Sequence, residues 1–499
     1  MLSGSVRTCA LSGSRRVAYR FGCYAIRCSS SSVSASVSAP TPGPAPAPAS
    51  IPTPASTLVP NPTSARLVEV RGRKVDADST SFNIPQNVLD ATSRQLLFEE
   101  DHPLDITRRL IRLHFPKPAF AHYDDYHPVV STAQNFDSLG FPSDHPGRAR
   151  TDTYYFNDGQ LLRTHTSAHQ AEAFSATSED QIGYIISADV YRRDEVDRHH
   201  YPVFHQMEGA RWWDRDRVPG GDVAAAVRSD VGSLPRHDFT VEDKTTPFQP
   251  DPNLLQEEHH SLAEVEAIDA HLRLSLENAL GGLFARARNQ SNDPLRMRWV
   301  DAYFPFTRPS WELEVLHDGD WIEVLGCGVV QHQLHAAAGT PSRLGWAFGL
   351  GLDRIAMLLF QIPDIRYLWS TDKRLKSQFR GMSQQLPNRL KPFRVFSKYP
   401  PCPRDISFWL PPNCTDLPDT DVVEMVRSVG GDLVEEVRCI DRFVHPTSGR
   451  HSKAFRIVYR SLECTLPRDV VKEVHQRVTE ALEKRYGVEM RYNAKTQPA

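Results

Sequence analysis

Residues 191–209, YRRDEVDRHHYPVFHQMEG, concentrate more unlike polar chemistry than an ordinary strand or helix needs. Apolar and β-branched residues precede them at 185–190, and apolar and polar residues alternate at 203–207. Both patterns are typical of strands, so we predict a long antiparallel hairpin here. Three candidate ligand contacts lie on or around its turn: Arg192, Asp194 and His200.

This hairpin has the side chains to hold an anion. Arg192 offers a planar fork of donors that matches a phosphate group. Gln206 and Glu208 are two residues apart, so they project from one face of the second strand. A solvated hairpin with surface ion pairs is the alternative and the usual outcome for a charge run. The alternation of apolar and polar residues at 204–208 favours a ligand site.

The composition is that of a soluble globular protein. Of the 499 residues, 40% are hydrophobic and 24% are charged, and the length is enough for several domains with a large core. The net charge of −3 gives no overall attraction to nucleic acid, so any RNA contact must be local. The eight cysteines include no C-x-x-C pair, which argues against structural zinc and against a disulfide framework. We expect no metal centre built from side chains and no membrane span.

The first 68 residues differ from the rest because they contain no Asp or Glu. Five arginines lie among many Ser and Ala within the first 27 residues: Arg7, Arg15, Arg16, Arg20 and Arg27. This composition is typical of an organelle transit peptide, and the Pro/Ala/Thr-rich residues 38–62 predict an extended linker. We expect the mitochondrial matrix as the destination, with plastids second. A disordered cytosolic tail is the alternative.

Three further segments carry candidate ligand contacts. LLRTHTSAHQ, residues 161–170, places His165 and Ser167 two apart on an expected extended segment. YFPFTRPSWELEV places Phe304 and Phe306 on one face, where they would suit an aromatic guest. WIEVLGCGVV adds a run at the expected pocket floor: Gly326, Cys327 and Gly328. Each segment also has a purely structural explanation, namely a loop Ser or His, core phenylalanines, and glycines that admit a neighbouring strand.

GWAFGLGLDRIAMLLF, residues 345–360, is predicted to be a strand that leads into a helix. Gly349 and Gly351 precede the helix, and Arg354 lies in its first turn. The third glycine and the βαβ context of a dinucleotide fold are missing, so we exclude a Rossmann fold. An arginine on an otherwise apolar helix indicates an anionic partner nearby.

Periodicity predicts the rest of the organisation. A helical pattern runs within residues 83–115, and residues 213–259 lose periodicity and are predicted to be an insertion or surface loop. An amphipathic helix is expected over 261–280, with Gly281 and Gly282 as its stop. Residues 391–499 give a β-α-β-β-α-β order, which predicts a ferredoxin-like domain.

Together these segments resemble class II aminoacyl-tRNA synthetases, in the form of the phenylalanyl-tRNA synthetases. FHQ-x-E after Arg192 resembles motif 2, GLGLDR resembles motif 3, and THTS resembles the segment whose His and Ser contact the amino acid. Residues 127–146 resemble motif 1, a dimer interface in the family, which this chain could use within a monomer. The resemblance implies an α+β fold. An antiparallel sheet flanked by helices would form the catalytic domain at 69–388, and the ferredoxin-like domain at 391–499 would bind the anticodon.

The resemblance also implies a role for each candidate. The ATP site would comprise Arg192, Asp194, His200, Phe204, Gly351 and Arg354, with Arg192, Arg354 and His200 assigned to catalysis. The phenylalanine site would comprise His165, Ser167, Gln206, Glu208, Phe304, Phe306, Gly326, Cys327 and Gly328. Mg²⁺ would bridge the phosphates of ATP with few protein ligands. Because both reactants are anionic, alignment and charge neutralisation would drive the reaction, with no covalent nucleophile.

The expected activity is ATP-dependent ligation of L-phenylalanine to tRNA(Phe) through a phenylalanyl-adenylate, for organellar translation, by a monomer. One alternative is a synthetase-like RNA-binding paralogue without catalysis. Arg192 and Arg354 argue against it, because a dead site has no physical reason to keep buried charges. The other alternative is a class II synthetase for a different amino acid, against which Phe304 and Phe306 argue.

Overall fold

The computed structural model describes residues 66–491 except 79, 177, 179, 246–254, 288–294, 318, 396–398, 413 and 463. The predicted transit peptide and linker lie outside the described residues, apart from 66–68. Those three residues already belong to strand β1 (Arg66–Val70), so structured chain begins slightly before the expected boundary. In the described part of the chain, no helix is both long and apolar enough to cross a bilayer.

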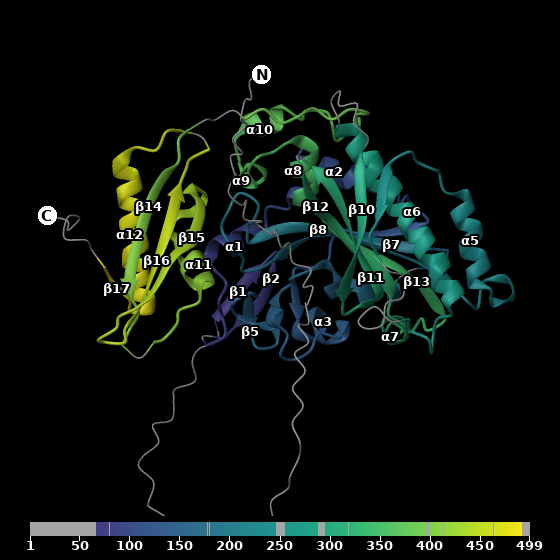
Figure 1. Cartoon of the computed structure of the whole chain (residues 1–499), viewed down its shortest axis with the longest axis horizontal. Coiled ribbons are helices and arrows are strands. Elements are labelled where there is room, and N and C mark those ends of the chain that lie inside the picture. Colours follow the sequence, from purple (N-terminus) through teal and green to yellow (C-terminus); the bar gives the residue numbers. More distant parts are fainter. Residues whose placement is uncertain are drawn as a thin grey trace, which may run out of the picture.

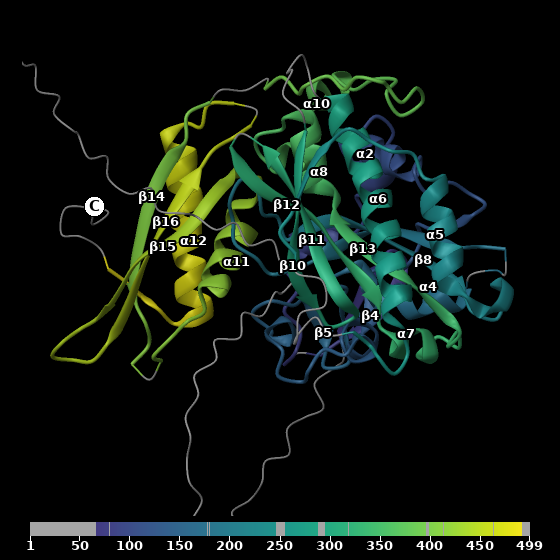
Figure 2. The same ribbon diagram turned by 45° about the vertical axis from the view of Figure 1, so that its right-hand side comes forward.

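A large sheet of eight strands dominates the body of the molecule (Figures 1 and 2). Its strand order is β3-β7-β8-β13-β12-β11-β10-β9, and the neighbours are antiparallel except for the parallel pairs β3–β7 and β9–β10 near the edges. The bounds are β3 Phe120–Tyr123, β7 Gly183–Tyr191, β8 Val203–Asp214, β9 Thr240–Asp243, β10 Arg296–Phe304, β11 Thr307–His317, β12 Asp320–Val330 and β13 Arg343–Gly351. Strands β7 and β8 form the predicted long hairpin.

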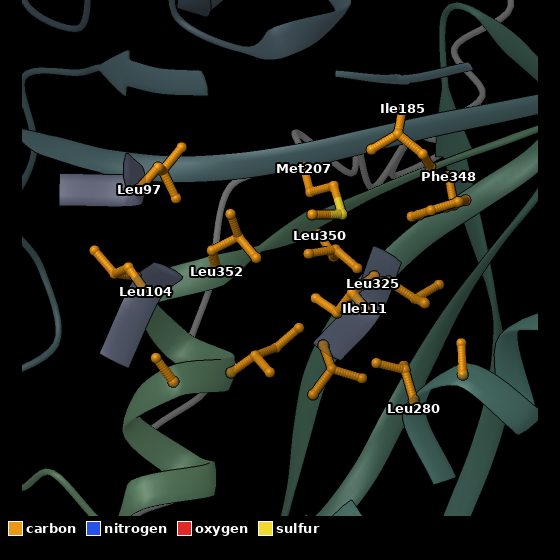
Figure 3. Close-up of a cluster of buried hydrophobic side chains, with 14 of the residues drawn as sticks. Leu97, Leu104, Ile111, Ile185, Met207, Leu280, Leu325, Phe348, Leu350 and Leu352 are labelled. Atoms are coloured by element: carbon orange, nitrogen blue, oxygen red, sulfur yellow. The ribbon is translucent and has the colours of Figure 1, made fainter. Parts of the chain in front are cut away.

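One face of this sheet is covered by three helices, α2 (Pro103–Arg112), α6 (Leu262–Ala287) and α8 (Leu352–Phe360). Side chains from strands and helices meet there in the main hydrophobic core, which Figure 3 shows in close-up. Strand residues of this core include Ile185, Met207, Leu325, Phe348 and Leu350. Because side chains alternate along a strand, the residues between them face the other side, where the candidate ligand contacts lie.

Helix α6 runs past Gly281 and Gly282, so their predicted role as a helix stop is wrong. A Cβ at Gly281 would lie 2.0 Å from the ring of Phe239. Glycine at 281 therefore lets that ring pack directly on the helix backbone. A glycine inside a helix costs only about 1 kcal/mol, which the packing of a long helix offsets.

The predicted insertion or surface loop at residues 213–259 implies irregular structure, and this implication is wrong over much of their described length. Strand β8 continues to Asp214, α5 spans Val223–Ser233, and β9 pairs with β10 at the sheet edge. Helix α5 begins at Asp222, whose side chain accepts a hydrogen bond from Ala225 N–H, a standard N-cap. The Gly and Pro residues around this short helix hid its pattern.

Smaller elements surround the large sheet. They include a two-stranded sheet, a three-stranded sheet and short helices. Their bounds are β1 with β2 Arg73–Ala77; β4 Val129–Ser131, β5 Tyr155–Asn157 and β6 Gln160–Leu162; α1 Gln86–Ala91, α3 Thr132–Asn135, α4 Gln170–Ala176 and α7 His332–Ala337.

The C-terminal region folds around its own core and has the predicted β-α-β-β-α-β order. In the sequence, helices α9 (Arg366–Trp369) and α10 (Lys373–Ser377) connect α8 to this region. Its strands lie in the order β15-β16-β14-β17. The bounds are β14 Cys402–Trp409, α11 Asp419–Gly430, β15 Val434–Val444, β16 His451–Tyr459, α12 Arg468–Tyr486 and β17 Glu489–Met490. The predicted fold class, α+β with a ferredoxin-like domain, is confirmed.

Candidate active site

Two adjoining cavities open on the face of the large sheet that the three helices leave uncovered, and Arg192 lines both. The larger is lined by predicted contacts His165, Ser167, Arg192, Gln206, Glu208, Phe304, Phe306, Gly326 and Cys327. The smaller is lined by Arg192, Asp194, His200, Phe204, Gly351 and Arg354. We call them the amino-acid cavity and the phosphate cavity. Gly328 is outside both linings.

Aromatic side chains form one end of the amino-acid cavity. The rings of Phe304 and Phe306 stack with centroids 5.9 Å apart and an interplanar angle of 11°. A Cβ at Gly326 would lie 2.6 Å from Cζ of Phe304, so only glycine leaves room for this ring. On the other side, Phe141 stacks on His165 with centroids 5.6 Å apart. The result is a slot for a flat apolar group.

Two of the predicted floor residues do not face this slot. Cys327 pairs with Trp311 and Phe348 across the sheet and belongs with them to the helix-covered core. Its thiol therefore points away from the cavity, and Cys327 borders the cavity because its glycine neighbours leave the backbone open. A Cβ at Gly328 would lie 2.3 Å from the backbone oxygen of Pro309, so this glycine admits a neighbouring strand. These two placements correct the sequence-based prediction.

The carboxylate of Glu208 lies at the polar end of the amino-acid cavity, with 3% of the residue exposed. It accepts hydrogen bonds from the hydroxyl groups of Ser167, Tyr184 (3.0 Å) and Thr166 (3.3 Å). Burial raises the pKa of Glu208 to about 7, although these hydrogen bonds favour the ionised form. A buried carboxyl surrounded by hydroxyl donors is suited to receive a small cation such as an ammonium group.

Ser167 reaches Glu208 from a 3-10 turn, Thr166–His169, and not from the extended segment we predicted. The backbone N–H of Thr166 also donates to Gln206 Oε1 at 3.2 Å, which fixes the turn on strand β8. His165 precedes the turn with extended backbone angles. Burial and the nearby charge of Arg192 lower the pKa of His165 to about 3, so its ring is neutral.

Arg192 lies where strand β7 ends, between the two cavities. Its Nε donates to the backbone oxygen of Thr164 at 2.8 Å, and its guanidinium lies 5.3 Å from the ring centroid of Phe204. These contacts aim the planar fork at the junction of the cavities. Arg192 can therefore touch a group in either one.

Arg354 approaches the phosphate cavity from the first turn of α8 and donates to the backbone oxygen of Glu323 at 2.9 Å. Burial lowers the pKa of Arg354 to about 10, so the side chain stays charged at neutral pH. His200 is held by Asp197 at 2.7 Å. Burial disfavours its charged form, but the hydrogen bond with Asp197 and the charge of Asp194 outweigh this and raise the pKa of His200.

Residues that the sequence did not single out complete the site. Glu312 and Glu323 lie on adjacent strands, and Glu323 is close to Arg354. Burial raises the pKa of both carboxyl groups, and the charge of Glu314 adds to this at Glu312 and that of Glu312 at Glu323. Ala347 on β13 lines the amino-acid cavity opposite Gly328. Carboxylates that alternate with apolar residues resemble an exposed strand, and alanine carries no chemical signal, so the sequence alone could not mark them.

Comparison with known proteins matches both parts of this architecture. The family model described as tRNA synthetases class II core domain (F) matches residues 88–218 and 255–379. The model described as Ferredoxin-fold anticodon binding domain matches residues 397–491. The large sheet and its two cavities are therefore the core of a class II aminoacyl-tRNA synthetase, a class that uses ATP.

Curated relatives narrow the class further. The chain is 42% identical to phenylalanine–tRNA ligase, mitochondrial, from Saccharomyces cerevisiae, over 85% of this chain and 95% of that protein. It is 39% identical to the Rattus norvegicus protein of the same name, over 86% and 90%. A chloroplastic/mitochondrial phenylalanine–tRNA ligase from Arabidopsis thaliana is 38% identical, over 84% and 85%. The chain belongs to the family of mitochondrial, single-chain phenylalanine–tRNA ligases, which confirms the resemblance.

Proposed function

We propose that the chain ligates L-phenylalanine to tRNA(Phe) in the mitochondrial matrix, and that the two cavities hold phenylalanine and ATP. One arrangement carries this proposal. A slot of stacked Phe304 and Phe306 and a buried carboxyl, Glu208, lie in one cavity, and Arg192 joins that cavity to a charged one. The spacing suits an amino acid whose ring enters the slot while its ammonium group meets Glu208.

In the first step, a carboxylate oxygen of phenylalanine attacks the α-phosphorus of ATP, and diphosphate leaves. Arg192 lies at the junction, so it would neutralise both the carboxylate and the α-phosphate and align them. Arg354 and His200 would meet the outer phosphates, with Gly351 and Asp194 beside them. Phe204 would stack on adenine, and its far side already contacts Arg192.

Glu312 and Glu323 fit the Mg²⁺ that ATP brings to such a site. Carboxylate oxygens are the ligands that Mg²⁺ prefers, and a divalent cation held by these two half-buried carboxyl groups would favour their ionised forms, which burial disfavours. When bound, the ion supplies positive charge to the phosphate chain. Its contacts with the protein would remain few.

In the second step, the terminal ribose hydroxyl of tRNA attacks the adenylate carbonyl and AMP leaves. The C-terminal domain would hold the anticodon end of the tRNA. Its outer sheet surface offers Trp409 flanked by Arg450 and Arg491, an arrangement that suits stacking on single-stranded bases. We expect one chain to carry out both steps as a monomer.

Amino-acid-dependent ATP–diphosphate exchange, measured with each of the twenty amino acids, tests the proposal. Phenylalanine should support exchange, and tyrosine should be about 100-fold weaker, since an apolar pocket rejects an added hydroxyl only to that extent. If none of the twenty amino acids supports exchange, the result would favour an RNA-binding paralogue. Exchange with an unrelated amino acid would mean that the slot is wrongly assigned.

A further inference from the structure

The loop between β7 and β8, residues 192–202, is embedded in the C-terminal domain. It carries Arg192, Asp194 and His200 of the phosphate cavity. At its centre, Val196 is only 2% exposed and belongs to the hydrophobic core of the C-terminal domain, not to the core of the large sheet. Its backbone oxygen accepts a hydrogen bond from Val437 N–H at 3.0 Å, which adds the loop to the edge strand β15.

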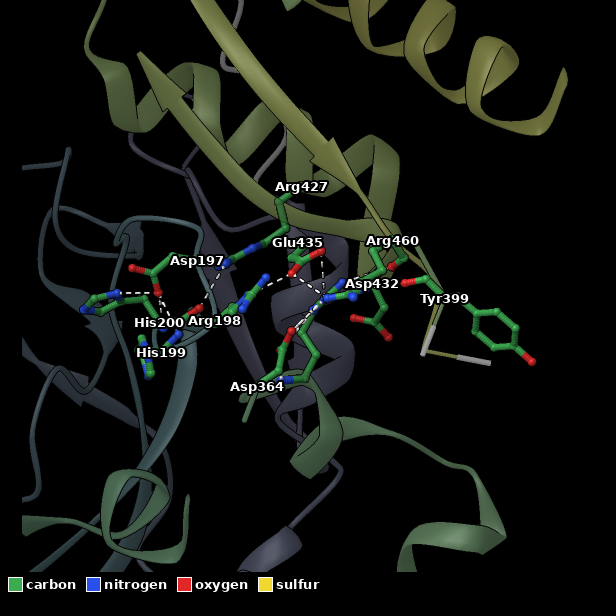
Figure 4. A network of polar contacts seen from close by, with 11 residues as sticks. Asp197, Arg198, His199, His200, Asp364, Tyr399, Arg427, Asp432, Glu435 and Arg460 are labelled. Atoms are coloured by element: carbon green, nitrogen blue, oxygen red, sulfur yellow. Dashed lines mark hydrogen bonds and ion pairs between the residues drawn. The ribbon is translucent and has the colours of Figure 1, made fainter. Parts of the chain in front are cut away.

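Ion pairs hold the loop on both sides of Val196, and Figure 4 shows the side with Arg198 and Glu435. Arg193 pairs with Asp421 of α11 at 2.7 Å, and Arg198 pairs with Glu435 of β15 at 2.8 Å. Glu435 is 2% exposed and also pairs with Arg460 at 3.1 Å. These pairs join one short loop to two elements of the C-terminal domain.

The body of the catalytic region secures the same interface. The hydroxyl of Tyr154 donates to Glu424 Oε2 at 2.7 Å inside the protein. Arg366 donates to the backbone oxygen of Asp432 at 3.0 Å. The guanidinium of Arg427 lies 5.2 Å from the ring centroid of Tyr201, at the end of the loop. The C-terminal domain thus packs directly against the loop and the residues beside it.

A loop of this length and polarity loses much conformational entropy when it is ordered. The ends of the loop are held by the catalytic region, where Arg193 N–H donates to the backbone oxygen of Asp152 at 3.0 Å and Arg198 O accepts from Ile365 N–H at 2.8 Å. The contacts at its centre come from the C-terminal domain, while its side chains Arg192, Asp194 and His200 line the phosphate cavity. Val196 is four residues from Arg192 and four from His200, so its seat in the core of that domain fixes both at once.

We propose that the C-terminal domain is a positioning element of the ATP site. Its docking orders the loop 192–202, so amino-acid activation depends on this domain even before tRNA is present. The inference rests on the proposed function in that ATP occupies the phosphate cavity. Because linkage is reciprocal, ATP must in turn strengthen the docking of the domain.

Full-length variants changed only on the C-terminal side test this inference. Glu435→Gln and Asp421→Asn each remove a partner of the loop without touching either cavity. In ATP–diphosphate exchange without tRNA, we expect the KM for ATP to rise about fivefold or more, the lower end of typical coupling between sites. The KM for phenylalanine should rise less, because Arg192 is the only residue of the loop 192–202 that lines the amino-acid cavity. Asp405→Asn, which breaks an exposed pair with Arg456 inside the same domain, is the matched control and should leave both constants unchanged.

A double-variant cycle separates docking from a general loss of stability. If Glu435 acts through Arg198, the variant carrying Arg198→Met and Glu435→Gln should lose little more than the worse single variant. Additive losses would overturn that link. Asp421 lies in the first turn of α11 with 25% of its side chain exposed, whereas Glu435 is buried, so Asp421→Asn keeps the test valid if Glu435→Gln unfolds the domain.

Hydrogen exchange gives a readout that does not need activity. ATP should slow exchange of the Val437 amide in the wild type, and less so in Asp421→Asn. Failure of ATP to protect this amide, or a wild-type KM for ATP in a variant whose Val437 amide exchanges freely, would overturn the inference. If ATP protects the Val437 amide in the wild type but phenylalanine supports no ATP–diphosphate exchange, only the proposed function is contradicted.

Discussion

The two cavities of the active site are built in opposite ways. The amino-acid cavity has its aromatic slot on strands of the large sheet, where glycines let rings pack directly on the backbone. The phosphate cavity takes Arg192, Asp194 and His200 from a loop that a second domain must hold. Choice of substrate therefore depends on rigid strands, and activation chemistry depends on charges whose position must be maintained from outside. Variants in the two cavities should fail in different ways.

The largest effect is expected at the junction. Arg192→Ala should lower the rate of adenylate formation by about 10²–10³-fold, or about 2.7–4 kcal/mol, by analogy with other groups that stabilise a charged transition state. ATP–diphosphate exchange measures this rate, and the thermal unfolding midpoint should change little. Arg456→Ala, at an exposed arginine of the C-terminal sheet, is the control. Exchange near the wild-type rate in Arg192→Ala would remove Arg192 from the mechanism.

Glu208→Gln should be the next most harmful change. A hydrogen bond to a charged group contributes about 1.5–3 kcal/mol, so kcat/KM for phenylalanine should fall roughly 10- to 150-fold. Because the ammonium group needs the ionised carboxyl and the pKa of Glu208 is about 7, wild-type kcat/KM should rise with pH through about 7. In Glu208→Gln this rise should be absent. A persisting rise would assign the titration to another group.

The same carboxyl affects stability. Its pKa is raised from 4.5 to about 7 on folding, so between these values the folded state keeps a proton that the unfolded state has lost. The free energy of unfolding should fall as pH rises through this window, by up to about 3 kcal/mol at about 1.4 kcal/mol per pH unit. Denaturant unfolding of wild type and Glu208→Gln at pH 5 and pH 7.5 checks the sign. An equal pH dependence in both proteins would contradict it.

A smaller effect is expected from crowding the aromatic slot. In Gly326→Ala the new methyl group would begin 2.6 Å from Phe304, so the ring must move into the space for the substrate. Overpacking of this kind costs about 2 kcal/mol, which would raise the KM for phenylalanine roughly 30-fold and leave the KM for ATP unchanged. Gly232→Ala, where a Cβ meets nothing within 4 Å, is the control. Equal changes in both KM values would mean general damage.

The sequence predicted the parts of the molecule that carry strong local patterns. The β7–β8 hairpin, the strand before α8 and the ferredoxin-like order all rest on periodicities confined to short segments. Prediction from the sequence failed where a residue packs against a partner that is distant in the chain. A helix with two adjacent glycines looks finished unless the ring of Phe239 is known to fill the gap.

The same limit applies to the site. Val196 is a lone apolar residue in a charged run, and nothing nearby shows that Val437 receives it. The tail therefore resembled a separate RNA-binding module, although it holds the phosphate loop. The glycines beside Cys327 predict that it lies in the pocket. In the structure Gly326 faces Phe304, so by strand alternation the thiol of Cys327 faces the opposite side of the sheet.

The smallest effect is expected on selectivity for para-substituted phenylalanines, and it should differ between variants of Ala347 and Cys327. On β13, Gly351 lines the phosphate cavity and Gly349 pairs with Glu208. Ala347 lines the amino-acid cavity and is the farthest of the three from the phosphate cavity along the strand. Removing its methyl group should lengthen the slot at the end that receives the para position of the ring. One methyl group corresponds to about 0.8 kcal/mol, so Ala347→Gly should raise activation of para-chlorophenylalanine relative to phenylalanine roughly fourfold.

Cys327→Gly is the matched variant, because it removes a small side chain from the adjacent strand on the opposite face. Its thiol packs with Trp311 and Phe348, so the loss should lower the thermal unfolding midpoint and leave the substrate ratio unchanged. Exchange rates with both amino acids, measured in the three proteins, decide the point. If Cys327→Gly changes the ratio and Ala347→Gly does not, the slot extends through the sheet toward the helices, and the rigid wall that distinguishes the amino-acid cavity from the phosphate cavity is wrongly drawn.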